Sequence, residues 1–169
     1  TLTKTTTTNA TISVPLNNAV GGSVAVNGGT LTLNAAGTDA GSTSIGSGAT
    51  LRLQANRSYG SGTSMLGSGT LDLSSGSIGF TTGATLGLAG TGTLTLSGAV
   101  ADFSMGALTL ANGLNITGGS LNGSSDITTA TAALTGGALN GTGSLTTTGA
   151  VSVGDITLSR TWNAQGSTS

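Results

Sequence analysis

A short pattern, in which a Thr precedes two leucines separated by one residue, constrains the fold of this chain more than any other feature. The pattern occurs at residues 30–33, 50–53, 70–73 and 93–96. The first leucines of successive pairs lie 20, 20 and 23 residues apart. A repeat of about 20 residues is typical of solenoids, in which each turn buries its apolar face against its neighbours.

The spacing inside each repeat predicts strands. Residues two apart on a strand share one face, whereas a helix would need spacings of three and four, which no stretch shows. Extended in both directions, the pattern predicts about eight turns of 18–23 residues, each with two inward apolar side chains. The first inward column contains Ile12, Leu31, Leu51, Leu71, Leu94, Leu114, Ala132 and Val151. Its partner column contains Val14, Leu33, Leu53, Leu73, Leu96, Ile116, Leu134 and Val153.

Two further columns predict three strands in each turn. One contains Val20, Tyr59, Phe80, Phe103, Leu121, Leu139 and Leu158, with only Ala40 in the second turn. The other contains Val24, Ile45, Met65, Leu86, Leu108, Ile127 and Leu145. The 23-residue step also separates Phe80 from Phe103, as expected if one inserted loop shifts everything after it. We therefore expect one all-β domain over residues 1–169, a three-sided parallel β-helix that is a segment of a longer repeat protein or fibre. Because parallel crossovers are right-handed in about 98% of cases, we expect a right-handed helix.

Composition excludes several functions. Only 5% of residues are charged, against about 25% in ordinary domains, and the chain has no His and no Cys. These absences exclude Ser-His-Asp and Cys-His catalytic groups and the usual zinc sites. The scattered basic residues give no nucleic-acid footprint, and no apolar run is long enough to span a bilayer as a helix. We therefore predict no enzyme activity, no catalytic, cofactor-binding or metal-binding residues, no cofactor, no nucleic-acid partner and no membrane insertion.

The high glycine content is consistent with either a flexible linker or the corners of a solenoid, and the regular spacing of apolar residues favours the solenoid. A Gly- and Ser-rich chain could be a flexible linker, but linkers lack a regular apolar rhythm. The glycines that lie beside the predicted strands fit the corners of the turns, where a positive φ is needed.

The outward positions carry a threonine ladder with several possible roles. One outward column contains Thr11, Thr30, Thr50, Thr70, Thr93, Gly113, Thr131 and Ala150. The other contains Ser13, Thr32, Arg52, Asp72, Thr95, Asn115, Ala133 and Ser152. Paired threonines on a flat face could bind ice, but Arg52 and Asp72 interrupt the pairs. These two residues are expected to be neighbours on successive turns, either as a surface ion pair or as a catalytic acid with an arginine.

Four other features carry predictions. Asn122 and Asn140 match across an 18-residue step and predict an asparagine ladder. Tyr59 falls in an inward column, which favours the core over a glycan-stacking platform. Trp162 could cover the last turn, contact a further turn or stack on a sugar. Residues 1–8 and 164–169 are polar, strand-like or disordered tails.

Residues 90–98, Gly-Thr-Gly-Thr-Leu-Thr-Leu-Ser-Gly, resemble the short repeat of autotransporter passenger regions. The whole chain is similar to the repeat regions of Gram-negative, filamentous-haemagglutinin-like adhesins. The sequence departs from the passenger repeat after Gly98, where Ala-Val-Ala-Asp follows. The resemblance implies a right-handed β-helix in a large exported surface protein, and it carries over no binding residue.

We therefore expect a non-catalytic stalk of a secreted or cell-surface adhesin from a Gram-negative bacterium. Such a rod would hold a binding tip away from the cell or make weak multivalent contacts with surface glycans or proteins. A second hypothesis is a subunit that stacks end to end on copies of itself, since open strand edges invite pairing. A glycan-acting enzyme, which would need a cluster of carboxylates, and an ice-binding protein remain further alternatives.

Overall fold

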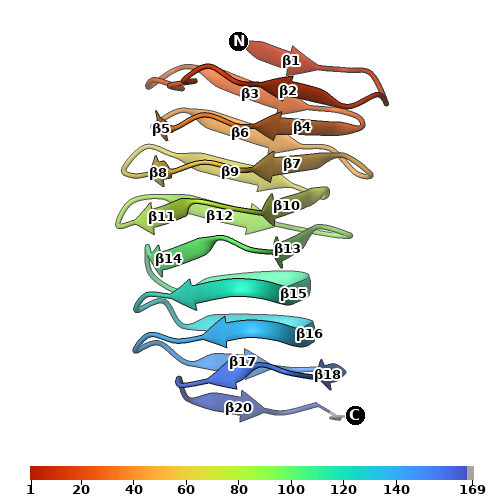
Figure 1. Ribbon diagram of the computed structural model, residues 1–169, viewed down its shortest axis with the longest axis vertical. Coiled ribbons are helices and arrows are strands. Elements are labelled where there is room, and N and C mark those ends of the chain that lie inside the picture. Colours follow the sequence, from red (N-terminus) through yellow and green to blue (C-terminus); the bar gives the residue numbers. More distant parts are fainter. Residues whose placement is uncertain (167–169) are drawn as a thin grey trace.

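The computed structural model describes residues 1–166, and these residues form a β-solenoid of about eight stacked turns (Figure 1). All regular elements in this range are strands, and these strands pair in parallel, as the sequence predicts. The same range contains no helix with the length and hydropathy needed to cross a bilayer.

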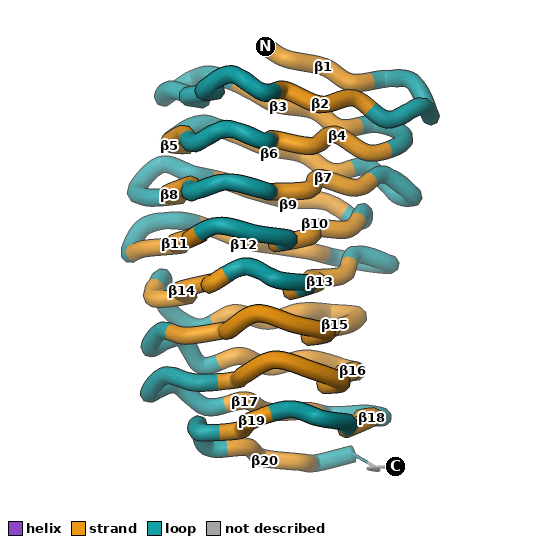
Figure 2. The backbone as a smooth tube through the Cα atoms, in the orientation of Figure 1, coloured by secondary structure: helices purple, strands orange, loops and turns teal. Residues whose placement is uncertain are grey.

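The strands stack into three faces, here named A, B and C in the order in which the chain visits them. Face A holds β1 (Leu2–Lys4), β3 (Ser23–Val26), β6 (Ser42–Ile45), β9 (Ser64–Gly67), β12 (Thr85–Leu88), β17 (Leu145–Thr147) and β20 (Trp162–Ala164). Face B holds β2 (Ala10–Ile12), β4 (Thr30–Leu33), β7 (Thr50–Leu53), β10 (Thr70–Leu73), β13 (Thr93–Leu96) and β18 (Val151–Val153). Face C holds β5 (Gly37–Asp39), β8 (Arg57–Tyr59), β11 (Ser77–Thr81), β14 (Val100–Ser104) and β19 (Thr157–Leu158). Two long strands, β15 (Leu108–Asn122) and β16 (Ile127–Leu139), run round the corners and contribute to all three faces (Figure 2).

The leucine pairs form the core on face B, in the register that the sequence predicts. Leu31 pairs with Leu51, Leu51 with Leu71 and Leu71 with Leu94, and all of these side chains are buried. The 23-residue step is confirmed as well, because Phe80 pairs with Phe103 on face C. These parallel pairs place each apolar side chain directly over its equivalent in the turn before.

The predicted register is wrong in the first turn. Ile12 pairs with Leu33 and Ala10 with Leu31, so β2 lies two residues earlier than expected. Val14 is therefore outside the core and 65% exposed, and Val20 is 82% exposed. The backbone leaves the sheet after Ile12, close to Pro15, which has no N–H to donate to the ladder.

The predicted inward columns on faces A and C are partly wrong, because each mixes residues that belong to two separate columns in the structure. On face C, Leu121 pairs with Ala101 and not with Phe103, so the leucines and the aromatic rings belong to separate columns. The second turn supplies Asp39 opposite Tyr59 where Ala40 was expected. On face A, the residue that pairs with Val24 and Met65 is Thr43, and Ile45 belongs to the adjacent column. At the far end, Val153 is 45% exposed, although the pattern places it inside.

Glycine is required at two corners where β15 and β16 turn from face B to face C. Gly119 and Gly137 have φ of +77° and +81°, a region that other L-residues rarely adopt. A Cβ on Gly137 would lie 2.5 Å from the carbonyl oxygen of Gly119 in the turn before. Both the conformation and the close approach of successive turns therefore exclude a side chain here.

We predict that Gly137→Ala lowers the free energy of unfolding by about 1–3 kcal/mol, because it forces an alanine into a positive-φ conformation against the preceding turn. Urea denaturation followed by circular dichroism measures the change. Gly79→Ala is the matched control, since Gly79 has an ordinary φ and no atom within 4 Å of an added Cβ. Equal losses in the two variants would contradict the requirement for glycine at the corner.

Candidate functional site

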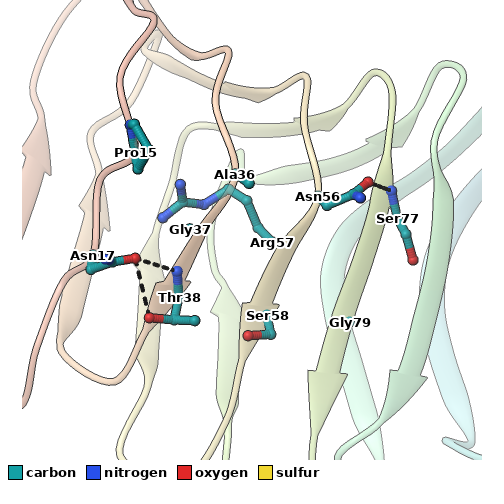
Figure 3. Close-up of a pocket in the computed structure, with 10 residues that line it drawn as sticks. All are labelled: Pro15, Asn17, Ala36, Gly37, Thr38, Asn56, Arg57, Ser58, Ser77 and Gly79. Carbon is teal, nitrogen blue, oxygen red and sulfur yellow. Dashed lines mark hydrogen bonds between the residues drawn. The ribbon is translucent and has the colours of Figure 1, made fainter.

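An open groove of about 630 Å³ lies beside face C in the first four turns (Figure 3). The loop of residues 15–17 lines one end. The outward-facing residues Thr38, Ser58 and Gly79, from β5, β8 and β11, line the rest of its length. The groove exists because these outward positions carry small side chains or none.

Two asparagines at the edge of the groove hold backbone groups of the next turn. The side-chain oxygen of Asn17 accepts a hydrogen bond from the backbone N–H of Thr38 at 2.9 Å (Figure 3). The side-chain oxygen of Asn56 accepts one from the backbone N–H of Ser77 at 2.8 Å. Within residues 1–166, the Nδ2 groups of both asparagines have no protein acceptor. The two amides are therefore fixed by the fold and keep free donors.

A buried arginine lies beneath the groove. Arg57 is only 3% exposed, and its guanidinium extends past Gly37 towards the first turn. Its NH2 group donates to the carbonyl of Leu16 at 2.9 Å, and its Nε donates to the Tyr59 hydroxyl at 3.1 Å. A Cβ on Gly37 would lie 2.6 Å from the guanidinium, so the missing side chain provides the space that the arginine fills.

Inside face C, a column of three stacked aromatic rings ends in a cluster of buried polar residues near Arg57. The Tyr59, Phe80 and Phe103 rings stack at centroid separations of 4.5 and 5.0 Å, and the next inward positions towards the N-terminus are Asp39 and Asn18. Asn18 donates to the Asp39 carboxylate at 3.1 Å. Burial raises the pKa of Asp39 above its ordinary value and raises the pKa of Tyr59 to about 12. The sequence pattern predicts apolar residues in this column and gives no sign of the polar cluster of Arg57, Asp39 and Asn18.

A second buried arginine lies near the other end of the stack. Arg160 follows β19 by two residues, and its NH2 group donates to the carbonyls of Gly123 at 3.1 Å and Ser125 at 3.3 Å. These acceptors lie two turns away, past Gly141 in the intervening turn. Burial lowers the pKa of Arg160, whose Nε and NH1 atoms are buried without an acceptor among the described residues. Each arginine side chain therefore crosses one intervening turn, and the residue of that turn beside the side chain is a glycine, Gly37 for Arg57 and Gly141 for Arg160.

The predicted ion pair between Arg52 and Asp72 is present on successive turns of face B. Arg52 Nε donates to Asp72 Oδ2 at 2.8 Å, and Ser97 from the following turn donates to Oδ1 at 2.6 Å. The Asp72 side chain is only 9% exposed, so the pair is less superficial than expected. The carboxylate has its oxygens occupied by Arg52 and Ser97. Among residues 1–166, no three acidic side chains gather in a group that could hold a metal.

The remaining predicted features are partly confirmed. In the threonine ladder, Thr70 and Thr93 hydroxyls lie 3.0 Å apart, whereas Thr131 donates to a backbone carbonyl instead. Asn140 and Asn122 are linked through the Ser120 hydroxyl rather than directly, by hydrogen bonds of 3.0 and 3.1 Å.

The predicted tails belong in part to the stack. Residues 2–4 form β1, and the buried Lys4 ammonium donates to the Gly28 carbonyl at 2.8 Å. Trp162, in β20, pairs with Leu145, is partly buried, and donates to the Thr147 hydroxyl at 3.1 Å. It is therefore part of the last described turn. Residues 167–169 of the predicted C-terminal tail lie outside the described residues.

Comparisons with known proteins found no match among protein-family models, curated proteins or solved structures. Function must therefore be inferred from the geometry of the chain itself.

We predict that Asp39→Asn makes the N-terminal turns less sensitive to pH. Burial raises the pKa of Asp39 from 3.8, so the folded chain holds this proton more tightly than the unfolded chain does. Stability is therefore greatest with Asp39 protonated and falls as pH rises from about 3.8 through the raised pKa. The asparagine keeps the acceptor for Asn18 and carries no charge.

The measurement is the urea midpoint of both proteins from pH 3 to pH 7. Hydrogen bonds from Ser144 lower the pKa of Asp126, so this group makes both proteins more stable as pH rises. Because that contribution is the same in both proteins, the difference between the two curves reports Asp39 alone. We expect the urea midpoint of Asp39→Asn to rise relative to that of the wild type as pH increases through the pKa of Asp39. Above that pKa the difference between the two midpoints should stay constant. A variant that loses stability relative to the wild type at pH 7 would show that the negative charge is needed beside Arg57.

Proposed function

We propose that this chain is a non-catalytic stalk segment of an extracellular bacterial surface protein. The observation that carries the proposal is the unbroken register of face B. One column runs through Thr11, Thr32, Arg52, Asp72, Thr95, Asn115, Ala133 and Ser152 with each residue paired to the next. A stack in which every turn repeats the same backbone pairing is suited to extending a structure in one direction.

The chemistry of the outward column supports a scaffold over an enzyme or an ice-binding protein. Within it the side chain changes from Thr to Arg, Asp, Thr, Asn and Ala along successive turns, while the inward neighbours remain apolar. A regular ligand such as ice would require the same outward group on every turn. A hydrolytic or lyase site would require several ionisable groups together, and on the described strands of face B only Arg52 and Asp72 are ionisable.

The small number of ionisable groups also suits an exposed location. The chain carries four basic and five acidic residues in 169, so little in the fold titrates when pH or salt changes outside a cell. The resemblance of residues 90–98 to autotransporter passenger repeats supports the same proposal.

We predict that one turn can be removed without unfolding the chain. Deletion of residues 94–113 joins Thr93 to Leu114, and these positions are in register because Leu94 pairs with Leu114. The rod should shorten by about 4.8 Å and keep its β-sheet spectrum, because each turn contacts only its neighbours. Solution X-ray scattering and circular dichroism measure both properties.

Deletion of residues 94–112 is the matched control. It removes one residue fewer, so Gly113 takes the place of Leu94, and the buried Leu114 and Ile116 of that turn are moved to the outward side. We expect this variant to misfold. A parent protein carrying the in-register deletion should still be labelled by antibody on intact cells. Labelling only after permeabilisation would contradict the extracellular location, and unfolding of the in-register variant would contradict the stalk.

A further inference from the structure

The groove of the first four turns presents hydrogen-bonding groups that the fold does not use. The Nδ2 donors of Asn17 and Asn56 have no protein acceptor within residues 1–166, and the oxygens of the same amides are held by backbone N–H groups. The Ser58 hydroxyl also lines the groove, on the outward side of β8. Most of the accessible lining is nevertheless apolar, and Pro15 and Ala36 contribute to it. A few fixed amides and hydroxyls on a mostly apolar surface are the groups that orient a ligand in a binding site.

The groove exposes almost no charge. Arg57 is the only ionisable residue that lines it, and its guanidinium is turned inward to Leu16 and Tyr59 and is 3% exposed. A charged ligand would therefore lose water without gaining an exposed partner of opposite sign. The chemistry of the lining favours a ligand that is polar but neutral.

The shape of the groove favours a chain over a compact molecule. It extends across four turns, from the loop of residues 15–17 to Gly79, and successive turns are about 4.8 Å apart. That interval is close to the length that one pyranose ring adds to an extended β-linked glycan. Asp102 pairs with Gly79 in the following turn and is exposed, which ends the uncharged surface at that point.

A peptide would fit this site less well. Extended peptides bind by adding a strand to a free sheet edge. Here the groove lies on the outer surface of face C, where β5, β8 and β11 are already paired with one another. A polyhydroxyl chain needs no such edge, because its hydroxyls can both accept from amides and donate to hydroxyl oxygens.

We propose that this groove binds an uncharged β-linked glycan that lies along the axis of the stack, with the Asn17 and Asn56 amides donating to its hydroxyls. The proposal goes beyond the stalk function and does not depend on it, because the groove occupies only the first four of about eight turns. A stalk with such a groove would bind glycan along its side.

The test is titration of the folded chain with cellohexaose and laminarihexaose, followed by calorimetry and by NMR of the Asn17 and Asn56 side-chain amides. We expect saturable binding of at least one of these glycans, with shifts of those amide signals and no dependence on salt. Gly79→Leu places a side chain in the groove at a position with no atom within 4 Å of an added Cβ, and should weaken binding at least about tenfold without loss of folding. Gly60→Leu is the matched control, because Gly60 has an ordinary φ and does not line the groove.

A second pair of variants tests the amide donor. Asn56→Asp keeps the oxygen that accepts from Ser77 and removes the Nδ2 donor, so it should weaken binding while the chain stays folded. Asn27→Asp makes the same change at an exposed position outside the groove and should have no effect.

Three results would overturn the proposal. The first is no binding of either hexasaccharide at millimolar concentration. The second is binding that survives Gly79→Leu. The third is preferential, salt-sensitive binding of oligogalacturonate, which would show that the groove selects charge. None of these results would alter the outcome of the turn deletion, so failure of the glycan site and failure of the stalk are distinguishable.

Discussion

Each turn of this solenoid leaves a row of backbone N–H and C=O groups that only the neighbouring turn can satisfy. Parallel strands meet that need when equivalent residues stack in register, and a slip of one residue would turn every leucine of face B towards water. The inward pairs such as Leu51 and Leu53 therefore do two things: they bury apolar surface, and they fix the register that satisfies the backbone. Close stacking in turn requires corners without side chains, as at Gly137.

The interior is apolar in its middle turns and polar towards both ends. Arg57 and Arg160 each reach backbone carbonyls two turns away, and each passes a turn that has glycine at the crossing position. Buried carbonyls and a guanidinium satisfy one another, whereas either alone would carry an uncompensated burial penalty. The arrangement at Arg57 also removes the only cation from the surface of the groove. The same contact that fills the space over Gly37 therefore leaves a groove lined by neutral amides and hydroxyls.

The sequence predicts the repeating part of this structure well, because periodic apolar positions report stacking directly. The face B leucines, the buried Tyr59 and the 23-residue insertion are all confirmed. The prediction for the first turn is wrong because Pro15 and its loop break the period, and extending the repeat through them places Val14 inside although it is exposed. The polar core residues and the groove were missed for related reasons. Asp39 stands where the pattern predicts an apolar residue. The groove is formed by small outward residues from different turns, such as Gly79, and these do not form a recognisable sequence motif.

Pulsed electron paramagnetic resonance between spin labels on Thr11→Cys and Ser152→Cys tests the in-register stack most directly. The chain has no native cysteine, and both positions are exposed members of one face B column, separated by seven successive pairings. Seven steps of about 4.8 Å predict a single narrow distance near 34 Å. A broad distribution, or a distance that corresponds to a different number of turns, would contradict the stacked register on which the fold and both proposals depend.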